Sequence, residues 1–129
     1  MEILFDELSV LPASPIDLPM PRDARALRAA LSVRATPGSG HALADAARGA
    51  GASARTLERL FRDETGFSFG AWRQRARLLR ALQLLAENES VTQAAIAVGY
   101  ASTSAFVAAF RRELGVTPGR YFKEQDASA

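Results

Sequence analysis

The chain contains the same helical unit twice, and this internal repeat restricts the possible folds more than any other feature of the sequence. Residues 46–51 match residues 94–99, and residues 53–72 match residues 102–121. The identical pairs are Ala46/Ala94, Ala47/Ala95, Gly51/Gly99, Ser53/Ser102, Phe61/Phe110, Arg62/Arg111, Glu64/Glu113, Gly66/Gly115 and Gly70/Gly119. Because a serine, small residues and turn glycines recur in the same order, each copy predicts a helix, a turn and a second helix.

In the first copy, we expect a helix over residues 41–48, a turn that uses Gly51 and a second helix capped by Ser53. The apolar residues of the second helix, Leu57, Leu60 and Phe61, are spaced to face the interior. The same spacing leaves a mostly charged set outward: Arg55, Thr56, Glu58, Arg59 and Arg62. A capped second helix with such an outward face is typical of units that enter a nucleic-acid groove.

A long helix is predicted over residues 68–88, with Ser68 as its cap. Its expected inward stripe consists of Trp72, Ala76, Leu79, Leu82 and Leu85. Because this helix lies between the two copies in the sequence, it can contact both of them and fix their separation.

The second copy repeats the logic of the first. Ser90 is expected to cap a helix that ends at Gly99, and Ser102 to cap the following one. The predicted core positions of the second copy are Ala94, Ala95, Val98, Phe106, Ala109, Phe110 and Leu114. Thr117 and Pro118 then begin a last helix, whose Tyr121 and Phe122 close the core.

The N-terminal part of the chain has a different composition. Residues 1–21 carry four acidic residues, no basic residue and four prolines, which predicts a linker or the tail of another domain. Over residues 22–40 we expect a short helix from Asp23, followed by a flexible break at residues 36–40. The inward face predicted for this helix consists of Ala24, Leu27, Ala30 and Leu31.

These elements predict an all-α fold of about seven helices. Two helix-turn-helix subdomains, over residues 41–72 and 89–124, are joined by the linker helix over residues 68–88.

Composition excludes several kinds of site. The 129 residues include no cysteine and one histidine, so disulfides, thiol chemistry and a histidine-based metal cluster are excluded, and we expect no cofactor. The longest apolar run is shorter than the roughly 18 residues of a membrane span, and the acidic N-terminus lacks the basic start of a signal peptide. We therefore expect a soluble cytoplasmic protein without a membrane partner.

The charge is unevenly distributed. The net charge is +2, and because residues 1–21 contribute −4, the remaining residues carry +6. All but one of the sixteen basic residues are arginine, which can form bidentate contacts with guanine edges and phosphates. A codon bias explains an excess of arginine equally well, but it does not explain why seven arginines lie between Ser53 and Arg80.

Residues 66–70 read Gly-Phe-Ser-Phe-Gly and match the nucleophile-elbow motif of esterases. That motif needs a strand before the serine, whereas here it joins two predicted helices. Ser68 is explained as a helix cap, and the only histidine, His41, is expected to be a solvated residue at a helix start. We therefore expect no enzyme activity and no catalytic residue.

These features resemble the DNA-binding domain of the AraC/XylS family of bacterial transcription regulators over about residues 41–122. The most specific motifs are A-x-x-V-G-Y from Ala95, S-x-S-A-F from Ser102 and F-R-R-E-L-G-V-T-P-G-R-Y from Phe110. The segment S-A-R-T-L-E-R-L-F-R-D-E-T-G from Ser53 is equally typical.

The resemblance implies that two recognition helices enter consecutive major grooves on one face of double-stranded DNA. By motif position, the expected base-reading residues are Arg55, Thr56, Glu58, Arg59, Thr103, Ser104, Val107 and Ala108. The expected phosphate contacts are Ser53, Arg62, Arg73, Arg77, Ser102, Arg111 and Arg112. Because the outward residues of the second recognition helix are small, we expect most base discrimination to come from the first.

The resemblance also implies partners and a cellular role. A regulator of transcription, with activator as the family expectation, would act with RNA polymerase, and a sensing or dimerising domain is expected outside this chain. Two other functions remain open at this point: a helical adaptor that binds proteins, and a nucleoid-type protein that binds DNA without sequence preference. The solvated-face interpretation of the arginines at positions 73–80 also remains open.

Overall fold

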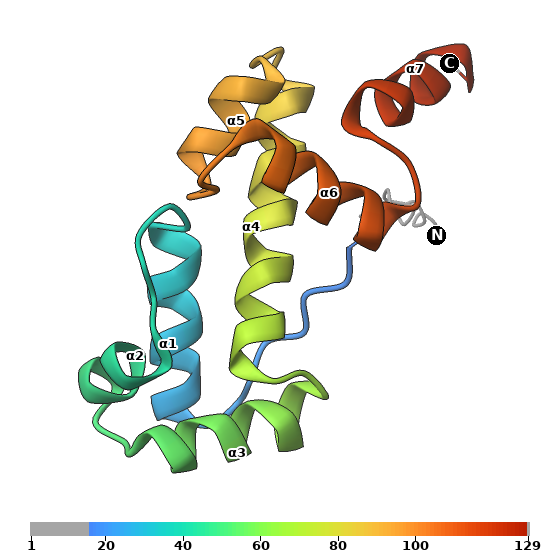
Figure 1. Cartoon of the computed structure of the whole chain (residues 1–129). Helices are drawn as coiled ribbons and strands as arrows, with labels where there is room; N and C mark the ends of the chain where they lie inside the picture. Colours follow the sequence, from blue (N-terminus) through green and yellow to red (C-terminus); the bar gives the residue numbers. More distant parts are fainter. Residues whose placement is uncertain (1–15, 129) are drawn as a thin grey trace.

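The computed structural model of the chain describes residues 16–128. Within them it contains no strand and seven helices, which confirms the all-α prediction (Figure 1): α1 (Ala24–Ala35), α2 (Leu43–Ala50), α3 (Ala54–Thr65), α4 (Phe69–Ala86), α5 (Val91–Ala97), α6 (Thr103–Leu114) and α7 (Pro118–Ser128). Residues 1–15 of the predicted N-terminal linker lie outside the described residues. No helix within the described range is both long and apolar enough to cross a bilayer.

The predicted caps are confirmed in the structure. The hydroxyl oxygens of Ser53, Ser68, Ser90 and Ser102 accept hydrogen bonds from the backbone N–H three residues later, at 3.0–3.1 Å. Gly51, Gly66 and Gly115 end α2, α3 and α6 with φ between 76° and 83°, a conformation that favours glycine. Helix α2 is displaced from its predicted bounds, because it begins at Leu43 rather than His41.

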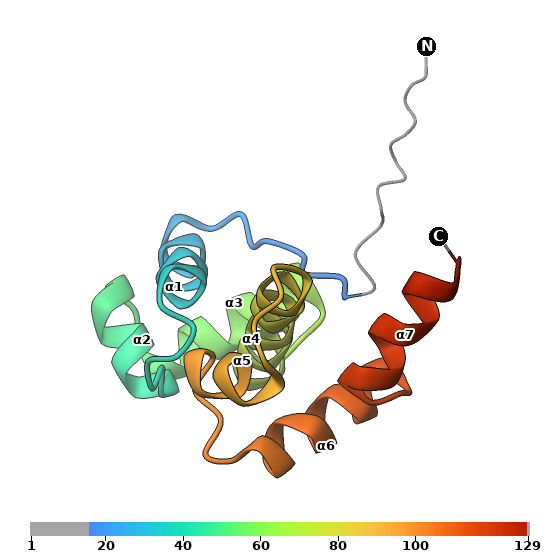
Figure 2. The same cartoon turned by 90° about the horizontal axis from the view of Figure 1, so that it is seen from above.

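Two hydrophobic cores lie on opposite faces of α4 rather than along one stripe. Phe69, Trp72 and Ala76 are buried in the core of the first copy, whereas Leu78, Ala81 and Leu82 are buried in the core of the second. At about 100° per residue, these two sets point in roughly opposite directions from the helix axis. The predicted inward stripe is divided between the two cores: Trp72 and Ala76 belong to the first, whereas Leu82 lies in the second and Leu85 packs against it. The prediction was wrong at Leu79, which is half-buried and belongs to neither core. Figure 2 shows α1 and α2 on one side of α4 and α6 and α7 on the other.

The predicted inward face of α1 is confirmed at Ala30 but was wrong at Ala24 and Leu31. The helix buries Ala26, Ala29, Ala30 and Val33, whereas Leu31 is 52% exposed and Ala24 is exposed. Small side chains allow α1 to lie close to α2, α3 and α4, all of which it contacts. Leu31 therefore remains on the outer face.

The repeat is visible in the packing of aromatic rings. In the first copy, the rings of Phe61 and Trp72 meet edge to face at 5.4 Å between centroids. In the second copy, Phe110 and Tyr121 occupy the equivalent positions and meet edge to face at 5.8 Å. Helix α7 therefore packs against the second copy in the way that the start of α4 packs against the first.

The segment that precedes α1 contacts both cores. Ile16 is buried in the second core, whereas Leu18 and Met20 pack against the first. The indole Nε1 of Trp72 donates a hydrogen bond to the carbonyl oxygen of Pro19 at 2.7 Å. Residues 16–20 therefore connect the two halves of the molecule, as Figure 1 shows by the path of this segment along α4.

The connection between α1 and α2, predicted as a flexible break, is attached to the rest of the fold. Arg77 donates to the carbonyl oxygens of Pro37 and Ser39 at 3.1 and 3.3 Å, and Arg73 donates to that of His41 at 2.6 Å. Gly38 lies so close to the end of α5 that a Cβ atom there would be 2.5 Å from the carbonyl oxygen of Ala97. This loop of the first half therefore packs against the second helix-turn-helix unit.

Candidate nucleic-acid interface

Two outward arginines of α3 are available for contacts outside the protein. Arg55 is exposed, and its side chain forms no hydrogen bond or ion pair with any residue in the described range 16–128. The side chain of Arg59 is 61% exposed, and its Nη1 lies 3.7 Å from Oδ2 of Asp63, a weak surface pair. Thr56 is less free, because its hydroxyl and its backbone N–H are both bonded to the Oγ of Ser53.

Glu58 is tied to neighbouring groups within the protein. Its Oε1 accepts a hydrogen bond from the backbone N–H of Phe69 at 3.0 Å, and its Oε2 accepts from Nε of Arg62 at 3.0 Å. Phe69 is the first residue of α4, so the carboxylate of Glu58 lies at the positive end of that helix dipole, which favours a negative charge. The base-reading role of Glu58 and the phosphate contact of Arg62 stay predictions, but both groups already have a structural function.

Helix α6 presents a smaller and less polar outward face than α3. Ser104 and Ala108 are exposed, whereas Thr103 is half-buried with its hydroxyl 3.4 Å from that of Thr92. Val107 is half-buried and packs against the second core. At the offset of 49 residues, Val107 takes the place of Glu58 in the repeat, but it packs against the core of its copy instead of forming polar contacts. The base-reading role of the α6 residues stays a prediction.

The predicted phosphate contacts fall into different surroundings. Arg111 and Arg112 are exposed in the last turn of α6, and their side chains have no hydrogen bond or ion pair within the described part of the chain. The hydroxyls of Ser53 and Ser102 serve as helix caps. These two serines therefore lie at the starts of both recognition helices, where backbone N–H groups favour an anion.

Arg73 and Arg77 lie one turn apart on α4, as their spacing predicted, but their guanidinium groups face the loop between α1 and α2. Both side chains are half-buried, and three of their N–H donors are taken by the loop carbonyls described above. Burial, together with the neighbouring charge of Arg73, lowers the pKa of Arg77. The predicted phosphate contacts stay predictions, and the solvated-face alternative does not describe these two residues.

The residue that sequence reasoning missed is Arg75. It was visible only as part of a run of arginines, yet it forms an ion pair with Glu113 of α6, with Nη1 and Oε1 2.9 Å apart. No local spacing predicts this ion pair, because Arg75 and Glu113 are far apart in the sequence. The one available signal was the recurrence of a glutamate at positions 64 and 113 of the repeat.

The nucleophile-elbow alternative at residues 66–70 lacks its structural context. The segment connects α3 and α4, and the Oγ of Ser68 accepts a hydrogen bond from the backbone N–H of Ala71. His41 is half-buried, and its Nε2 lies 2.9 Å from the carbonyl oxygen of Thr36 in a solvent-exposed contact. Ser68 is thus a helix cap between two helices, as the cap pattern predicted.

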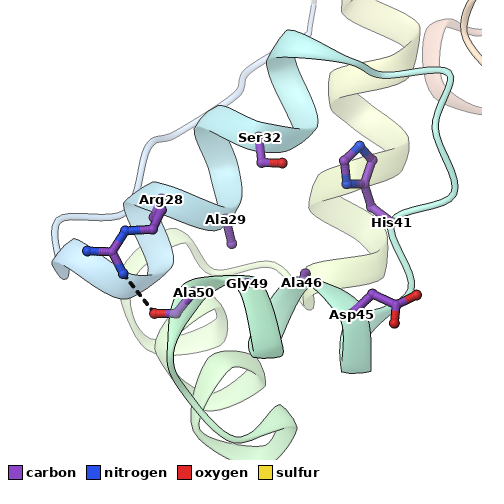
Figure 3. Close-up of a pocket in the computed structure, with 8 residues that line it drawn as sticks. All are labelled: Arg28, Ala29, Ser32, His41, Asp45, Ala46, Gly49 and Ala50. Atoms are coloured by element: carbon purple, nitrogen blue, oxygen red, sulfur yellow. Dashed lines mark hydrogen bonds between the residues drawn. The ribbon is translucent and has the colours of Figure 1, made fainter.

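A pocket of about 230 Å³ opens between α1 and α2 (Figure 3), and its lining includes Arg28, His41 and Asp45. Their polar groups have partners within the protein. Arg28 donates to the carbonyl oxygen of Ala50 at 2.9 Å, and Asp45 pairs with Arg48. The pocket is therefore a seam between two helices, and we assign no ligand to it.

Comparison with known proteins agrees with this geometry. The family model for a helix-turn-helix domain matches residues 46–124. The HTH-type transcriptional regulator NimR of Escherichia coli is 38% identical over 121 residues, which cover 94% of this chain and 44% of NimR. RipA of Corynebacterium glutamicum is 42% identical over 104 residues, 81% of this chain and 31% of that protein. The chain thus spans less than half the length of these two curated relatives.

Solved structures show the same fold with similar sequences. A transcriptional regulator with an AraC-type DNA-binding domain from Chromobacterium violaceum has a TM-score of 0.71 and 30% identity, covering 74% of this chain and 87% of that chain. The DNA-binding domain of AdpA, solved in complex with a target DNA, has a TM-score of 0.74 and 30% identity, covering 83% of this chain and 96% of that chain. Two capped recognition helices on one linker helix, a matching family model and these relatives together show that the chain belongs to the AraC/XylS family and comprises its DNA-binding domain.

Proposed function

We propose that this domain binds a specific sequence of double-stranded DNA by placing α3 and α6 in successive major grooves. The observation that carries the proposal is that two equivalent capped helices with outward polar faces are attached to the two halves of α4 (Figure 1). The 18 residues of α4 span about 27 Å, of the same order as the roughly 34 Å between successive major grooves.

Within this proposal, α3 reads the bases more strongly than α6. Arg55 and Arg59 have long, exposed side chains that can donate two hydrogen bonds to O6 and N7 of guanine. To accept a hydrogen bond from cytosine N4, Glu58 would have to give up its bond from Phe69 or from Arg62. We therefore propose that its main role is to hold the start of α4 against α3. On α6, Ala108 and Val107 are suited to the methyl group of thymine, and Thr103 and Ser104 to short polar contacts.

The phosphate contacts that we propose begin with Arg111 and Arg112, because their guanidinium N–H groups have no partner within residues 16–128. At Ser53 and Ser102, the N-terminal ends of α3 and α6 would provide further phosphate contacts. Arg62, Arg73 and Arg77 would contact phosphate only with donors that remain after their contacts inside the protein.

Selection of binding sites from random duplexes tests the proposal directly. We expect a bipartite consensus with stronger base preference in the part contacted by α3, and an affinity that falls steeply as the salt concentration rises. Salt dependence without an enriched sequence would support the nucleoid-type alternative. Weak binding to every duplex, with no salt dependence, would support the protein-binding adaptor.

The same domain is proposed to act in transcription, in the cytoplasm and with RNA polymerase as a partner. Support comes from relatives whose names state that role, such as the transcriptional activator NphR of Rhodococcus, 40% identical over 83 residues. The share of NimR and RipA that the chain spans supports a sensing or dimerising domain in the complete regulator. Transcription from a promoter carrying the selected site, with and without the protein, tests whether it activates.

A further inference from the structure

Arg75 of α4 contacts three separate segments of the protein. Its Nε donates to the carbonyl oxygen of Asp17 at 2.8 Å, and its Nη1 donates to Oε1 of Glu113 on α6 at 2.9 Å. The carbon of its guanidinium group lies 4.7 Å from the ring centroid of Phe67, in the turn between α3 and α4. One side chain therefore joins the segment before α1, the turn that follows the first recognition helix, and the second recognition helix.

The surroundings of this ion pair distinguish it from ordinary surface pairs. The side chain of Arg75 is 19% exposed and that of Glu113 is 28% exposed, whereas the side chains of the Arg59–Asp63 pair are both more than 60% exposed. Salt and water therefore screen the Arg75–Glu113 attraction less than they screen the other pair.

Glu113 occupies a position that does not favour a carboxylate in an isolated helix. It lies in the last turn of α6, where the helix dipole disfavours negative charge. Its repeat equivalent, Glu64, also lies in a last turn and also reaches outside its helix, to the backbone N–H groups of Arg22 and Asp23 at 2.6 and 2.9 Å. In both copies, this glutamate attaches a recognition helix to another segment, but only Glu113 connects the two halves.

We propose that Arg75 is a positioning residue that, through Glu113, fixes the orientation of α6 relative to α3 and so sets which spacing between two DNA half-sites the domain accepts. This inference rests on the proposed function. One added base pair rotates the second major groove by about 34°. A fixed angle between the recognition helices discriminates against that rotation, whereas a broad range of angles tolerates it.

The first test needs no DNA. The chain has no cysteine, so spin labels can be placed through Asp63→Cys on α3 and Ala108→Cys on α6, both at exposed positions. Pulsed electron resonance should show a broader distance distribution between the labels in Arg75→Met and in Glu113→Gln than in the parent. Arg80→Met is the matched control and should leave the distribution unchanged. It removes an exposed arginine of the same helix whose side chain, among the described residues, bonds only to Gln83 one turn away.

The second test uses the full chain and the duplex selected above, with one or two base pairs inserted between the half-sites. For Arg75→Met and Glu113→Gln, the affinity ratio between the selected and the one-pair-longer duplex should fall by at least about fivefold relative to the parent. Binding to a duplex that keeps only the α3 half-site should be unchanged.

The two tests separate failure of this inference from failure of the proposed function. Unchanged distance distributions and an unchanged spacing preference, in variants with native circular dichroism, would overturn the positioning role. If the parent selects no sequence, the proposed function fails, and the distance measurement still decides whether Arg75 fixes α6. Glu113→Gln keeps the size of the side chain, so it gives a second answer if Arg75→Met unfolds.

Discussion

At the scale of single residues, arginines with the same spacing have different functions because their surroundings differ. Arg55 and Arg59 on α3 are four residues apart, as are Arg73 and Arg77 on α4. The first pair is exposed, whereas the second is half-buried, with donors on the carbonyl oxygens of the loop between α1 and α2. We therefore expect the first pair to contact DNA and the second pair mainly to stabilise the fold.

Replacement of Arg59 by alanine tests base reading. Because a bidentate contact to guanine is lost, binding to the selected duplex should weaken by about 1–3 kcal/mol in fluorescence anisotropy titrations. Binding to a scrambled duplex should weaken much less. Arg34→Ala, an exposed arginine of α1, is the control, and equal losses on both duplexes for Arg59→Ala would contradict base reading.

Comparison of Arg77→Met with Arg112→Met tests whether each guanidinium group donates its hydrogen bonds within the protein or to DNA phosphates. Because Arg77 donates to two loop carbonyls, its replacement should lower the free energy of unfolding by about 1 kcal/mol, measured by urea titration. Replacement of Arg112 should leave stability unchanged and reduce the slope of log affinity against log salt by about 1. A reduced slope for Arg77→Met would instead support its phosphate contact.

At the scale of single elements, the helix ends are where local sequence and structure agree best. Four serines cap the helices at the predicted positions, and the turn glycines take the positive φ values that were expected of them. Asp23 similarly caps α1, with its carboxylate accepting from the backbone N–H groups of Arg25 and Ala26. A carboxylate cap, unlike a serine, makes the stability of its helix depend on pH.

The pH dependence of α1 follows from the pKa of Asp23. Hydrogen bonds from the side chain and the backbone of Arg25 lower this pKa from 3.8 to about 2. Because the folded state favours the carboxylate, the contribution is complete above pH 3.8 and is lost as the pH falls from 3.8 toward about 2. Asp23→Asn keeps an oxygen acceptor without the charge, so its urea midpoint should decline less over this range than that of the parent.

The control for this experiment is Glu64. Backbone N–H groups of Asp23 and Arg22 lower its pKa as well, so its contribution is lost in the same direction, as the pH falls below its usual value of 4.5. Glu64→Gln should therefore flatten the decline at higher pH than Asp23→Asn does. Identical pH profiles for the parent and Asp23→Asn would show that this cap carries none of the dependence.

At the scale of the whole molecule, α4 is not the only connection between the two halves. Residues 16–20 contact both cores, Arg75 pairs with Glu113, and the loop at Gly38 packs against the turn after α5. Each connection joins residues that are far apart in the sequence. The relative placement of the two recognition helices is therefore a property of the whole domain.

Gly38 offers a test of the loop contact, with Gly40 as its matched control. A Cβ atom at Gly38 would be 2.5 Å from the backbone oxygen of Ala97, whereas a Cβ atom at Gly40 would have no heavy atom within 4 Å. Gly38→Ala should lower the free energy of unfolding by about 1–3 kcal/mol through overpacking. Gly40→Ala should be neutral or more stable by less than about 1 kcal/mol, because alanine restricts the unfolded chain. Equal stabilities of the two variants would contradict the contact.

The helices, their caps, the turn glycines and most of the buried residues of α3, α5 and α6 could be predicted from the amino-acid sequence. These features depend on interactions within a few residues, such as a serine hydroxyl bonded to an N–H group three positions later. The internal repeat showed that two helices are equivalent in their caps and buried positions. Together with the resemblance to a known family, it identified these two helices as the recognition helices.

Which face of a helix is buried, where two apolar faces compete, follows from the packing of the whole fold. Helix α1 buries Ala29 and Val33 rather than Leu31, and α4 divides its apolar residues between two cores. The tertiary structure also assigned Glu58, Arg73, Arg75 and Arg77 to contacts inside the protein. The physical reason is the same in each case: the partner comes from a distant part of the chain, and spacing within one helix carries no information about it.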